Sequence, residues 1–497
     1  MKAKSINSII KKTVLCICML IFIIALCPID LQNDTFFDIS LGKEYINNGI
    51  FKIDNFSVHS NLSYQTHHIF ENLIIYNIYN TFNYIGLHVF EIILTCIISI
   101  LFYLLNNQFT KNRKIAYVMV FLEMIMFSSF ISLRAQMFSS IIFLTQILLI
   151  NKYLYQTLSK KANNIILIIL TLMPILLINF HGGVIFFFYI IMAVYIINLN
   201  KINIIRIEND KNIDKKKLKK LIITSIISLP LLVLNPYGIN GITYMFRTLS
   251  NSFINANIQE FQPFSIKGGM GVNILIYFTI YIGSLIFSDK KIKIHEILFM
   301  LGTIFMSLIS IRHFIFYIIT TVVLLPHLEF VLMRIKKWLY DGLNEKGPKA
   351  MTITIDVVII FVIISVITNN FVYKKYDFVP SEIYPVKAIT YIKENIGYDK
   401  VIFNEYTWGS YMMLNNLKVF IDSRCDLYTV EYNKGVTVAE DYINTLKCKM
   451  HYEDTVSKYN IDYFLIKKDE SLSVMLLKDC NYENIYEDNI SYIFRKK

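Results

Sequence analysis

Charge is scarce in this chain. Only 17% of its 497 residues are Asp, Glu, Lys or Arg, while 55% are hydrophobic. Ordinary soluble domains carry roughly 25% charged residues, so this composition excludes a soluble globular protein. The sequence instead predicts a polytopic membrane protein, in which most side chains face lipid or neighbouring helices.

Cysteine and tryptophan are also scarce. The seven cysteines contain no CxxC spacing, and Cys16, Cys18, Cys27 and Cys96 lie in or beside apolar runs. This distribution excludes a disulfide framework and a cysteine-based metal site. One of the two tryptophans, Trp408, stands beside a glycine in the last part of the chain, which has a different character from the rest.

Acidic residues are fewer than basic ones, 37 against 49, and the formal net charge is +12. The basic residues gather in alternate short loops between apolar runs, near residues 2–12, 111–114, 152–161, 201–220, 289–293 and 334–337. Basic loops of this kind orient helices with that side in the cytoplasm, so nucleic acid is not an expected partner. The pattern predicts a cytoplasmic N-terminus and places loop 30–84, loop 236–271 and the C-terminal tail outside the cytoplasm.

Long apolar runs recur up to about residue 372. A helix needs about 20 apolar residues to cross the hydrocarbon core, and we expect about eleven such helices in a transmembrane domain of residues 1–372, with the count least certain between 137 and 200. The runs begin near Thr13, Ile85, Ile115, Met137, Asn164, Val184, Leu221, Val272, Ile294, Phe314 and Met351. The N-terminus resembles a signal peptide, but the many later spans favour an uncleaved first helix.

The tail, residues 373–497, alternates between helical and extended patterns. Helices are predicted over 384–396, 428–447 and 471–479, and strands over 400–404, 417–422, 461–467, 483–488 and 491–496. Alternating strands and helices are typical of an α/β layer. About 125 residues are enough for one domain, so the tail is predicted to be an extracytoplasmic α/β domain.

The loop after the first span is unusually polar. It carries Asp38, Asp54, His68 and Glu71, and its pieces FFDISLGKEYI and HHIFENLIIYNIY are amphipathic, which predicts helices along the membrane interface. His67 and Glu71 are four residues apart, and His68 and Glu71 are three residues apart, so either pair can share one helix face. For any single carboxylate, a solvated loop is the alternative. The loop could hold a divalent cation, but no ligand spacing requires one, so no metal ligands are predicted.

Isolated polar residues stand at the predicted outer ends of other spans. They are Arg134, Gln136, His181, Asn235, Arg312 and His313. Each alone could cap a helix or meet lipid headgroups. Together they share one predicted face with the acidic loop, and ionisable residues at membrane depth are costly and usually functional. We therefore predict a site for an anionic, membrane-borne substrate, where Arg and His bind phosphate and a carboxylate acts as base.

In this order, the motifs resemble those of a large bacterial family of polytopic membrane proteins similar to GT-C glycosyltransferases, a group that includes oligosaccharyltransferases and protein mannosyltransferases. The markers are FFDISLGKEYINNGIFKIDNFS, THHIFENLIIY, RAQMFS, NFHGG, LNPYG with IQEFQP, RH at 312–313, and VIFNEYTWGSYM followed by VFIDSRCDLY. The resemblance covers most of the chain. It implies a GT-C-like fold in the cell membrane. It also implies transfer of a sugar from a polyprenyl-phosphate-linked donor to a surface glycan or protein acceptor.

The resemblance further implies individual roles in the polar loop. GT-C enzymes typically place the catalytic carboxylate in the first outer loop, a position that matches Asp38, and Asp54 matches a second recurrent acid. His68 and Glu71 match the polar pair that follows. The surroundings FFDIS differ from the usual family pattern, which has tryptophans and a histidine around the acid.

The segment EYTWGSYM resembles the aromatic–glycine motif in the soluble domain of oligosaccharyltransferases, which helps to recognise the acceptor. Trp408 would then offer a stacking surface for a sugar or peptide, and Gly409 would permit close backbone approach. The alternative is that Trp408 is a core residue and Gly409 part of a turn. The full set predicted to bind substrate is His68, Glu71, Arg134, Gln136, His181, Arg312, His313 and Trp408.

Two other functions remain open at this point. A transporter or flippase of lipid-linked envelope precursors would need a continuous polar path through the bilayer, lined by Glu91, Glu123 and Asp356. A non-catalytic relative could instead scaffold envelope assembly. The sugar and the acceptor are not determined by the sequence.

The predicted sidedness is testable with a reporter enzyme that is active only outside the cytoplasm. We expect a signal when the reporter is fused after Tyr376, because the tail is predicted to be extracytoplasmic. A fusion within the basic loop 201–220 is the control and should be silent. Silence after Tyr376 with a signal from the control would reverse the predicted orientation.

Overall fold

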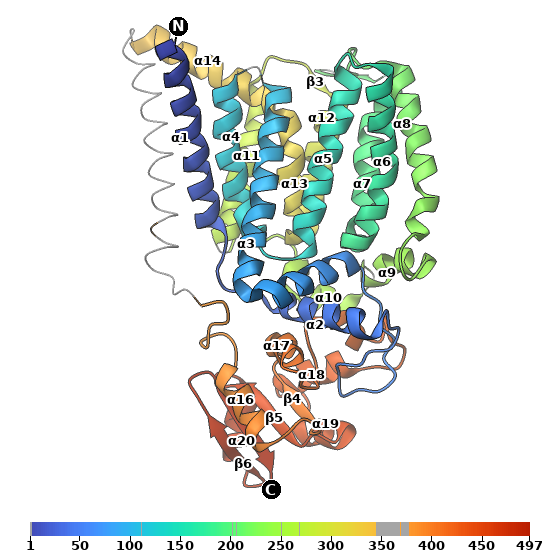
Figure 1. The fold of residues 1–497 in the computed structure, drawn as a ribbon, viewed down its shortest axis with the longest axis vertical. Coiled ribbons are helices and arrows are strands. Elements are labelled where there is room, and N and C mark those ends of the chain that lie inside the picture. The colour runs from blue at the N-terminus through green and yellow to red at the C-terminus, as the bar shows by residue number, and fades with distance from the viewer. Residues whose placement is uncertain are drawn as a thin grey trace.

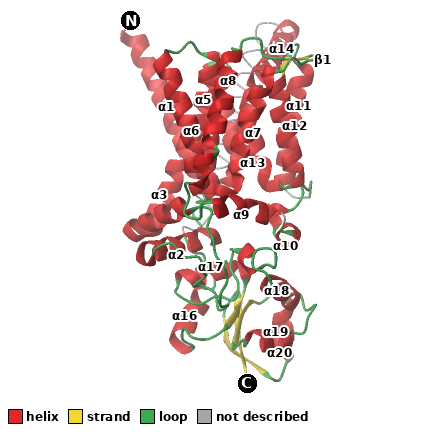
Figure 2. Ribbon diagram, turned by 90° about the vertical axis from the view of Figure 1, so that its right-hand side faces the viewer, coloured by secondary structure: helices red, strands yellow, loops and turns green. Residues whose placement is uncertain are grey.

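The computed structural model describes residues 2–343, except 111, 201, 205, 250 and 268, together with residues 368 and 377–497. Long helices stand side by side in a bundle, and the C-terminal region, residues 377–497, lies beyond one end of it (Figure 1). The N-terminus lies at the opposite end (Figure 2). Shorter helices run across the bundle axis between the bundle and the C-terminal region (Figure 1).

Apolar helices form the bundle, because each helix satisfies its own backbone hydrogen bonds. They are α1 (Lys2–Leu26), α3 (Ile69–Phe109), α4 (Arg113–Phe127), α5 (Ala135–Tyr155), α6 (Lys160–His181), α7 (Ile185–Ile196), α8 (Lys215–Ser228), α11 (Gly269–Phe287), α12 (Ile294–Ile309), α13 (Phe314–Thr320) and α14 (Leu325–Leu343). At the N-terminal end of the bundle, β1 (Asn203–Ile204), β2 (Ile207–Glu208) and β3 (Ile292–Lys293) form a small sheet.

The expected membrane spans are partly reproduced. Within the described residues, four helical segments are long and apolar enough to cross a membrane: Ile69–Phe109, Ala135–Tyr155, Lys160–Leu199 and Ile311–Trp338. Three shorter apolar helices are Thr13–Leu26, Gly271–Phe287 and Ile294–Ile309. The count of about eleven spans therefore stays a prediction, and the run that begins near Met351 lies outside the described residues.

Helix α3 is broken near its start. Asn83 has φ 52° and ψ −155°, which are not helical values. The part before Asn83 runs across the bundle beside α2 (Asn33–Asn48), and the part after it enters the bundle (Figure 1). The break lies close to Ile85, where the sequence predicts that an amphipathic segment gives way to a span.

Helix α2 packs closely on the first part of α3. A Cβ atom on Gly42 would lie 2.2 Å from Asn72 O and 2.5 Å from Tyr76 Cβ, so a larger residue would push the two helices apart. Asp38 lies one turn before Gly42 on the buried face of α2. The helix crossing thus places the Asp38 carboxyl against the start of α3.

The C-terminal region contains a four-stranded sheet in the order β4-β5-β7-β6. Its strands are β4 (Ile402–Asn404), β5 (Tyr463–Lys467), β6 (Tyr482–Glu487) and β7 (Ser491–Lys496), and its helices are α16 (Val386–Asn395), α17 (Gly409–Leu414), α18 (Val438–Leu446), α19 (Tyr452–Tyr459) and α20 (Ser471–Lys478). Strand β4 is parallel to β5, and the other pairs are antiparallel. The strands agree with those predicted for the tail except over 417–422. The helix predicted over 428–447 begins only at Val438, and α17 and α19 were not predicted.

The strand predicted over 417–422 is wrong. This segment does not join the sheet but pairs with the first loop, residues 30–84. Val419 N donates to Phe56 O, and Val58 N donates to Val419 O. An extended pattern predicts that a segment needs backbone partners, but the identity of those partners depends on contacts far away in the sequence.

Trp408 and Gly409 belong to the interior of the C-terminal region. The Trp408 side chain is 1% exposed, and its Nε1 donates to Ile383 O at 2.8 Å. A Cβ atom on Gly409 would lie 2.1 Å from Ile421 O and 2.8 Å from Asp422 Cα. Gly409 therefore permits the close backbone approach that the sequence predicts, while the Trp408 ring packs in the core.

Gly409→Ala should destabilise the C-terminal region. The added Cβ would overlap Ile421 O, and such overpacking lowers the free energy of unfolding by roughly 1–3 kcal/mol. Thermal unfolding of the purified protein, followed by circular dichroism, measures the effect. Gly302→Ala in α12, where an added Cβ meets nothing within 4 Å, is the control and should be neutral or slightly stabilising. An unchanged Tm for Gly409→Ala would contradict the tight packing.

Candidate functional site

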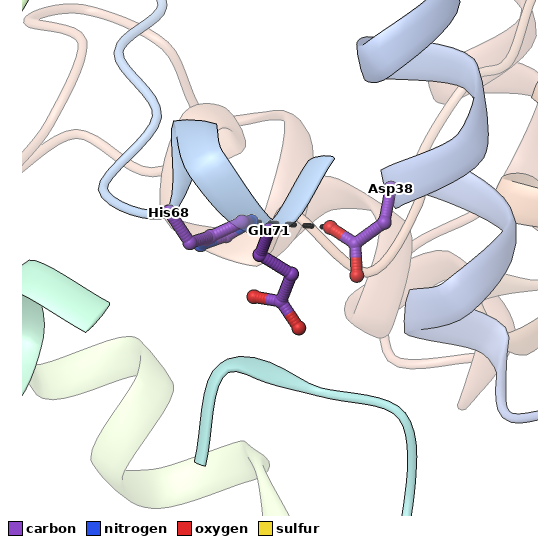
Figure 3. Close-up of side chains that lie close together, drawn as sticks. All are labelled: Asp38, His68 and Glu71. Carbon is purple, nitrogen blue, oxygen red and sulfur yellow. Dashed lines mark ion pairs between the residues drawn. The ribbon is translucent and has the colours of Figure 1, made fainter. Parts of the chain in front are cut away.

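Asp38, His68 and Glu71 form a buried cluster between α2 and the start of α3. His68 Nε2 lies 3.3 Å from Asp38 Oδ1, and Asn72 Nδ2 donates to the same oxygen at 2.6 Å. One ligand atom from each of the three residues lies within 4.8 Å of the others. Figure 3 shows the three side chains close together, with the contact between His68 and Asp38 as a dashed line.

Local sequence accounts for this arrangement. His68 is the N-cap residue of α3, and Glu71 lies in the first turn of the same helix. A carboxylate is favoured there because it faces the positive end of the helix dipole. Asp38 lies on the apolar face of α2 between the buried Phe37 and Ile39, so the packing of that face carries the carboxyl inward.

The cluster has unmet hydrogen-bonding capacity. Both ring nitrogens of His68 and Oε1 of Glu71 are buried and have no hydrogen-bond partner among the described residues. Buried polar groups are normally hydrogen-bonded, and imidazole nitrogen with carboxylate oxygen is a ligand set that divalent cations such as Zn²⁺ and Mn²⁺ accept. Burial raises the pKa of Asp38 above its ordinary value, although the nearby His68 opposes this shift. The residues therefore fit a divalent cation.

Aromatic rings surround the cluster on one side. His67 lies against His68 with ring centroids 4.5 Å apart and stacks on Tyr244 at 4.6 Å. His181 is 6.4 Å from His67, measured between ring centroids, and its Nδ1 lies 2.9 Å from Ser139 Oγ. The structure thus brings His181 near the cluster without a contact to its carboxylates among the described residues.

Arg134 is held by two carboxylates. It pairs with Asp34 at 2.6 Å and with Glu260 at 2.6 Å, and so it joins the start of α2 to the loop before α11. Burial alone would lower the pKa of Arg134, but Asp34 and Glu260 hold it above its ordinary value. Gln136 donates to Phe130 O at 3.0 Å and shapes the turn before α5.

Arg312 and His313 differ from Arg134 in their partners. The Arg312 guanidinium lies over the ring of Phe261, 4.3 Å from its centroid. No hydrogen bond or ion pair to a described residue holds it. His313 Nδ1 lies 3.2 Å from Met306 O. Arg312 is therefore a cation whose hydrogen-bond donors are unused among the described residues. It lies over Phe261, the residue that follows Glu260, and Glu260 is the carboxylate that pairs with Arg134.

Asp54 lies in a different environment from Asp38. Its Oδ1 accepts from Arg424 Nη1 at 2.6 Å, and its Oδ2 accepts from Ser57 N at 2.8 Å. Burial alone would raise the pKa of Asp54, but the Arg424 guanidinium and the bonds from Ser57 hold it below its ordinary value. The structure brings together Asp38, His68 and Glu71, and it joins Asp54 to the C-terminal region.

Several residues of the site were not predicted from the sequence. Asn72 directly follows Glu71 in HHIFEN, and a polar residue inside an otherwise apolar helix was the available signal. Glu260 lies in IQEFQP, a segment that was noted only as a family marker. Tyr244 gave no distinct signal, because its position beside the cluster depends on the packing of distant helices. His67 was noted only for its spacing of four residues from Glu71.

No protein-family model matches the chain, and a comparison with curated proteins finds no match. Among solved structures, the chain is similar to archaeal oligosaccharyltransferase AglB from Archaeoglobus fulgidus in complex with an inhibitory peptide and a dolichol-phosphate. The TM-score is 0.61 at 12% identity, over 92% of this chain and 69% of that chain. A structure of the same enzyme tethered with an acceptor peptide containing the NVT sequon gives the same values.

A third structure of this enzyme, a complex with Zn and sulfate, has a TM-score of 0.57 and 12% identity over 91% of this chain and 68% of that chain. At such identity the likeness concerns the fold. The chain therefore has the GT-C-like fold of an oligosaccharyltransferase, as the sequence predicts.

Proposed function

We propose that this protein is a membrane glycosyltransferase that moves a sugar from a polyprenyl-phosphate-linked donor to a protein or glycan acceptor at the outer face of the cell membrane. The observation that carries this proposal is the buried Asp38–His68–Glu71 cluster, in which the His68 ring nitrogens and Glu71 Oε1 have no hydrogen-bond partner among the described residues. The likeness to AglB supports it, because AglB structures contain an acceptor peptide or a dolichol-phosphate. Helix α2, which carries Asp38, lies at the end of the bundle that faces the C-terminal region (Figure 1).

Asp38 is the proposed catalytic base. Asn72 and His68 approach Oδ1, which leaves Oδ2 as the oxygen that accepts the proton of the acceptor group. A carboxylate oxygen in this position can take that proton as a general base. Asp54 has both oxygens engaged, so its proposed contribution is to hold the first loop in place for the reaction.

His68 and Glu71 are the proposed partners of Asp38 in binding a divalent cation. Their unpartnered nitrogen and oxygen atoms face the same buried cluster. A bound cation would supply Lewis-acid stabilisation of the phosphate leaving group. The identity of the metal follows from ligand chemistry alone, which favours Mn²⁺ or Zn²⁺ over Ca²⁺ because one ligand is an imidazole.

Arg312 is the proposed contact for the donor phosphate. Its guanidinium has donors that no described residue uses, and charge-assisted bonds from arginine match phosphate oxygens. The Glu260 side chain is 47% exposed. If the donor phosphate displaced Glu260 from Arg134, Arg134 would also bind the phosphate. Gln136, His181 and His313 would line the same face, and Trp408 would support the acceptor surface from within the C-terminal region.

Transport is less well supported. Glu91 and Asn106 are 15 residues apart on α3, and Asn106 donates to Glu123 at 2.9 Å. This separation corresponds to roughly 22 Å along the helix, so the two carboxylates do not adjoin. Asp356 lies outside the described residues.

Asp38→Asn should abolish sugar transfer while leaving the protein folded. Loss of a general base typically reduces the rate by roughly 10²–10⁴-fold, and the amide keeps the size of the carboxyl. The assay is release of polyprenyl phosphate from a panel of radiolabelled polyprenyl-phosphate sugars by purified protein in nanodiscs. Chelation of divalent cations should have the same effect.

The matched control for this assay is Asp289→Asn, because the Asp289 side chain is 73% exposed and pairs only with the exposed Arg334 among the described residues. It should retain full activity. Transfer by Asp38→Asn at the wild-type rate would move the base elsewhere. Absence of turnover by wild-type protein across the panel, despite donor binding, would favour a non-catalytic role.

Arg312→Met and Arg134→Met should separate binding from stability. Arg134→Met leaves Asp34 and Glu260 unpaired and should lower the free energy of unfolding by about 1–3 kcal/mol. Arg312→Met removes a cation that has no hydrogen-bonded partner among the described residues. It should leave Tm unchanged or raised, while KM for the donor rises roughly 10- to 150-fold. Arg334→Met, at the exposed pair with Asp289, is the control. A large loss of Tm with unchanged KM for Arg312→Met would contradict the proposed phosphate contact.

A further inference from the structure

A buried charge cluster fixes segment 422–428 of the C-terminal region. Arg424 Nε and Nη2 donate to the two oxygens of Asp422 at 2.9 and 2.7 Å, and Nη1 donates to Asp54 Oδ1 at 2.6 Å. The side chains of Arg424 and Asp54 are 3% and 0% exposed. Tyr428 OH also donates to Asp422 Oδ2, at 2.6 Å. Because its carboxylates are so fully engaged, this cluster serves as an anchor and offers little to a substrate.

The anchor continues into the first loop. Phe56 and Tyr64 of that loop place their rings 5.4 and 5.1 Å from the Arg424 guanidinium. Asn433 Nδ2 donates to Ser63 O, and Ser63 N donates to Asn433 Oδ1, at 3.1 and 3.0 Å. The loop that connects α2 to α3 is therefore held along its length by the C-terminal region.

A second line of contacts leads from the same segment to the candidate site. Tyr244 OH, in α9 (Ile239–Leu249), donates to Asp426 Oδ2. The Tyr244 ring stacks on His67 with an angle of 22° between the planes. His67 in turn meets His68 edge to face, at 86°, and His68 lies 3.3 Å from Asp38.

The orientation of His68 depends on this packing. A metal-binding histidine is usually oriented by a hydrogen bond from its second ring nitrogen, but neither nitrogen of His68 has such a partner among the described residues. Its ring is bounded by Phe37, 5.7 Å away between centroids, and by His67. The His67 backbone is held by Gly182, just after the end of α6, since Gly182 N donates to His67 O at 2.8 Å. The His67 ring itself stacks on Tyr244.

We propose that segment 422–428 of the C-terminal region is a positioning element for the Asp38–His68–Glu71 cation site, acting through the bond from Tyr244 to Asp426. This inference rests on the proposed function, because it assumes that the cluster binds a divalent cation. Asp426 and Tyr244 touch neither the cation ligands' donor atoms nor a substrate in this scheme, so they are positioning residues. The C-terminal region thereby becomes part of the catalytic unit.

The test measures Mn²⁺ affinity, by electron paramagnetic resonance, and sugar-transfer kinetics on full-length protein in nanodiscs. Tyr244→Phe keeps the ring and loses the bond to Asp426, and it should weaken Mn²⁺ binding roughly tenfold. The value of kcat should fall while KM for the donor stays unchanged. Asp426→Leu should behave in the same way. Asp426→Asn should recover wild-type behaviour, since its amide oxygen still accepts from the tyrosine hydroxyl.

Matched variants make the outcome decisive. The double variant Tyr244→Phe/Asp426→Leu should be no weaker than either single one, because both remove the same bond. Tyr486→Phe, whose hydroxyl donates to Asp488 at 3.1 Å elsewhere in the C-terminal region, is the control and should bind Mn²⁺ normally. If Asp426→Leu does not fold, Tyr244→Phe decides alone.

The experiment distinguishes failure of the positioning role from failure of the proposed glycosyltransferase activity. Wild-type Mn²⁺ affinity in Tyr244→Phe, or no Mn²⁺ binding by the wild-type protein, would overturn the positioning role. Mn²⁺ binding with the expected pattern among the variants, but without sugar transfer by the wild type, would support the positioning role and overturn the proposed glycosyltransferase activity.

Discussion

A guanidinium buried between two carboxylates joins the two halves of this protein. Arg424 is in contact with Asp54 of the first loop and Asp422 of the C-terminal region, with 3% of its own side chain exposed. Removing one partner of such a pair costs about 3–5 kcal/mol, because a charge is left uncompensated away from water. The loop fixed in this way connects the helices that carry Asp38 and His68, so the geometry of the candidate site depends on it.

The buried and half-buried charged groups fall into two classes by how fully they are bonded. Arg424 and Arg134 donate to two carboxylates each, and their role in the fold follows from these bonds. Within the part of the chain that the structure describes, His68 and Glu71 have buried atoms without hydrogen-bond partners, and the Arg312 guanidinium meets the ring of Phe261 without a hydrogen bond or ion pair. Leaving such groups unpaired is costly, so the second class marks where a ligand of matching charge would be stabilised.

Individual helices and strands were largely predictable from the sequence, but the segments that they contact were not. The amphipathic stretch around Asp38 predicted a helix, and α2 is that helix. The extended stretch 417–422 predicted a strand of the sheet, yet Val419 pairs with the first loop. The family resemblance implied that Asp54 is a second acid of the site in the loop that carries Asp38. The structure places Asp54 against Arg424, 370 residues away in the sequence.

Apolar length and periodicity were enough to predict a helical membrane-type chain with an α/β tail, because both act through hydrogen bonds between near neighbours. The sequence also predicted Asp38, His68 and Glu71 as residues of the functional site. Which charged groups have hydrogen-bond or ion-pair partners depends on tertiary contacts. The cost of burying a charge depends on the atoms packed around it, and for Arg424, Asp54 and the His67–His68 pair those atoms come from segments far apart in the chain.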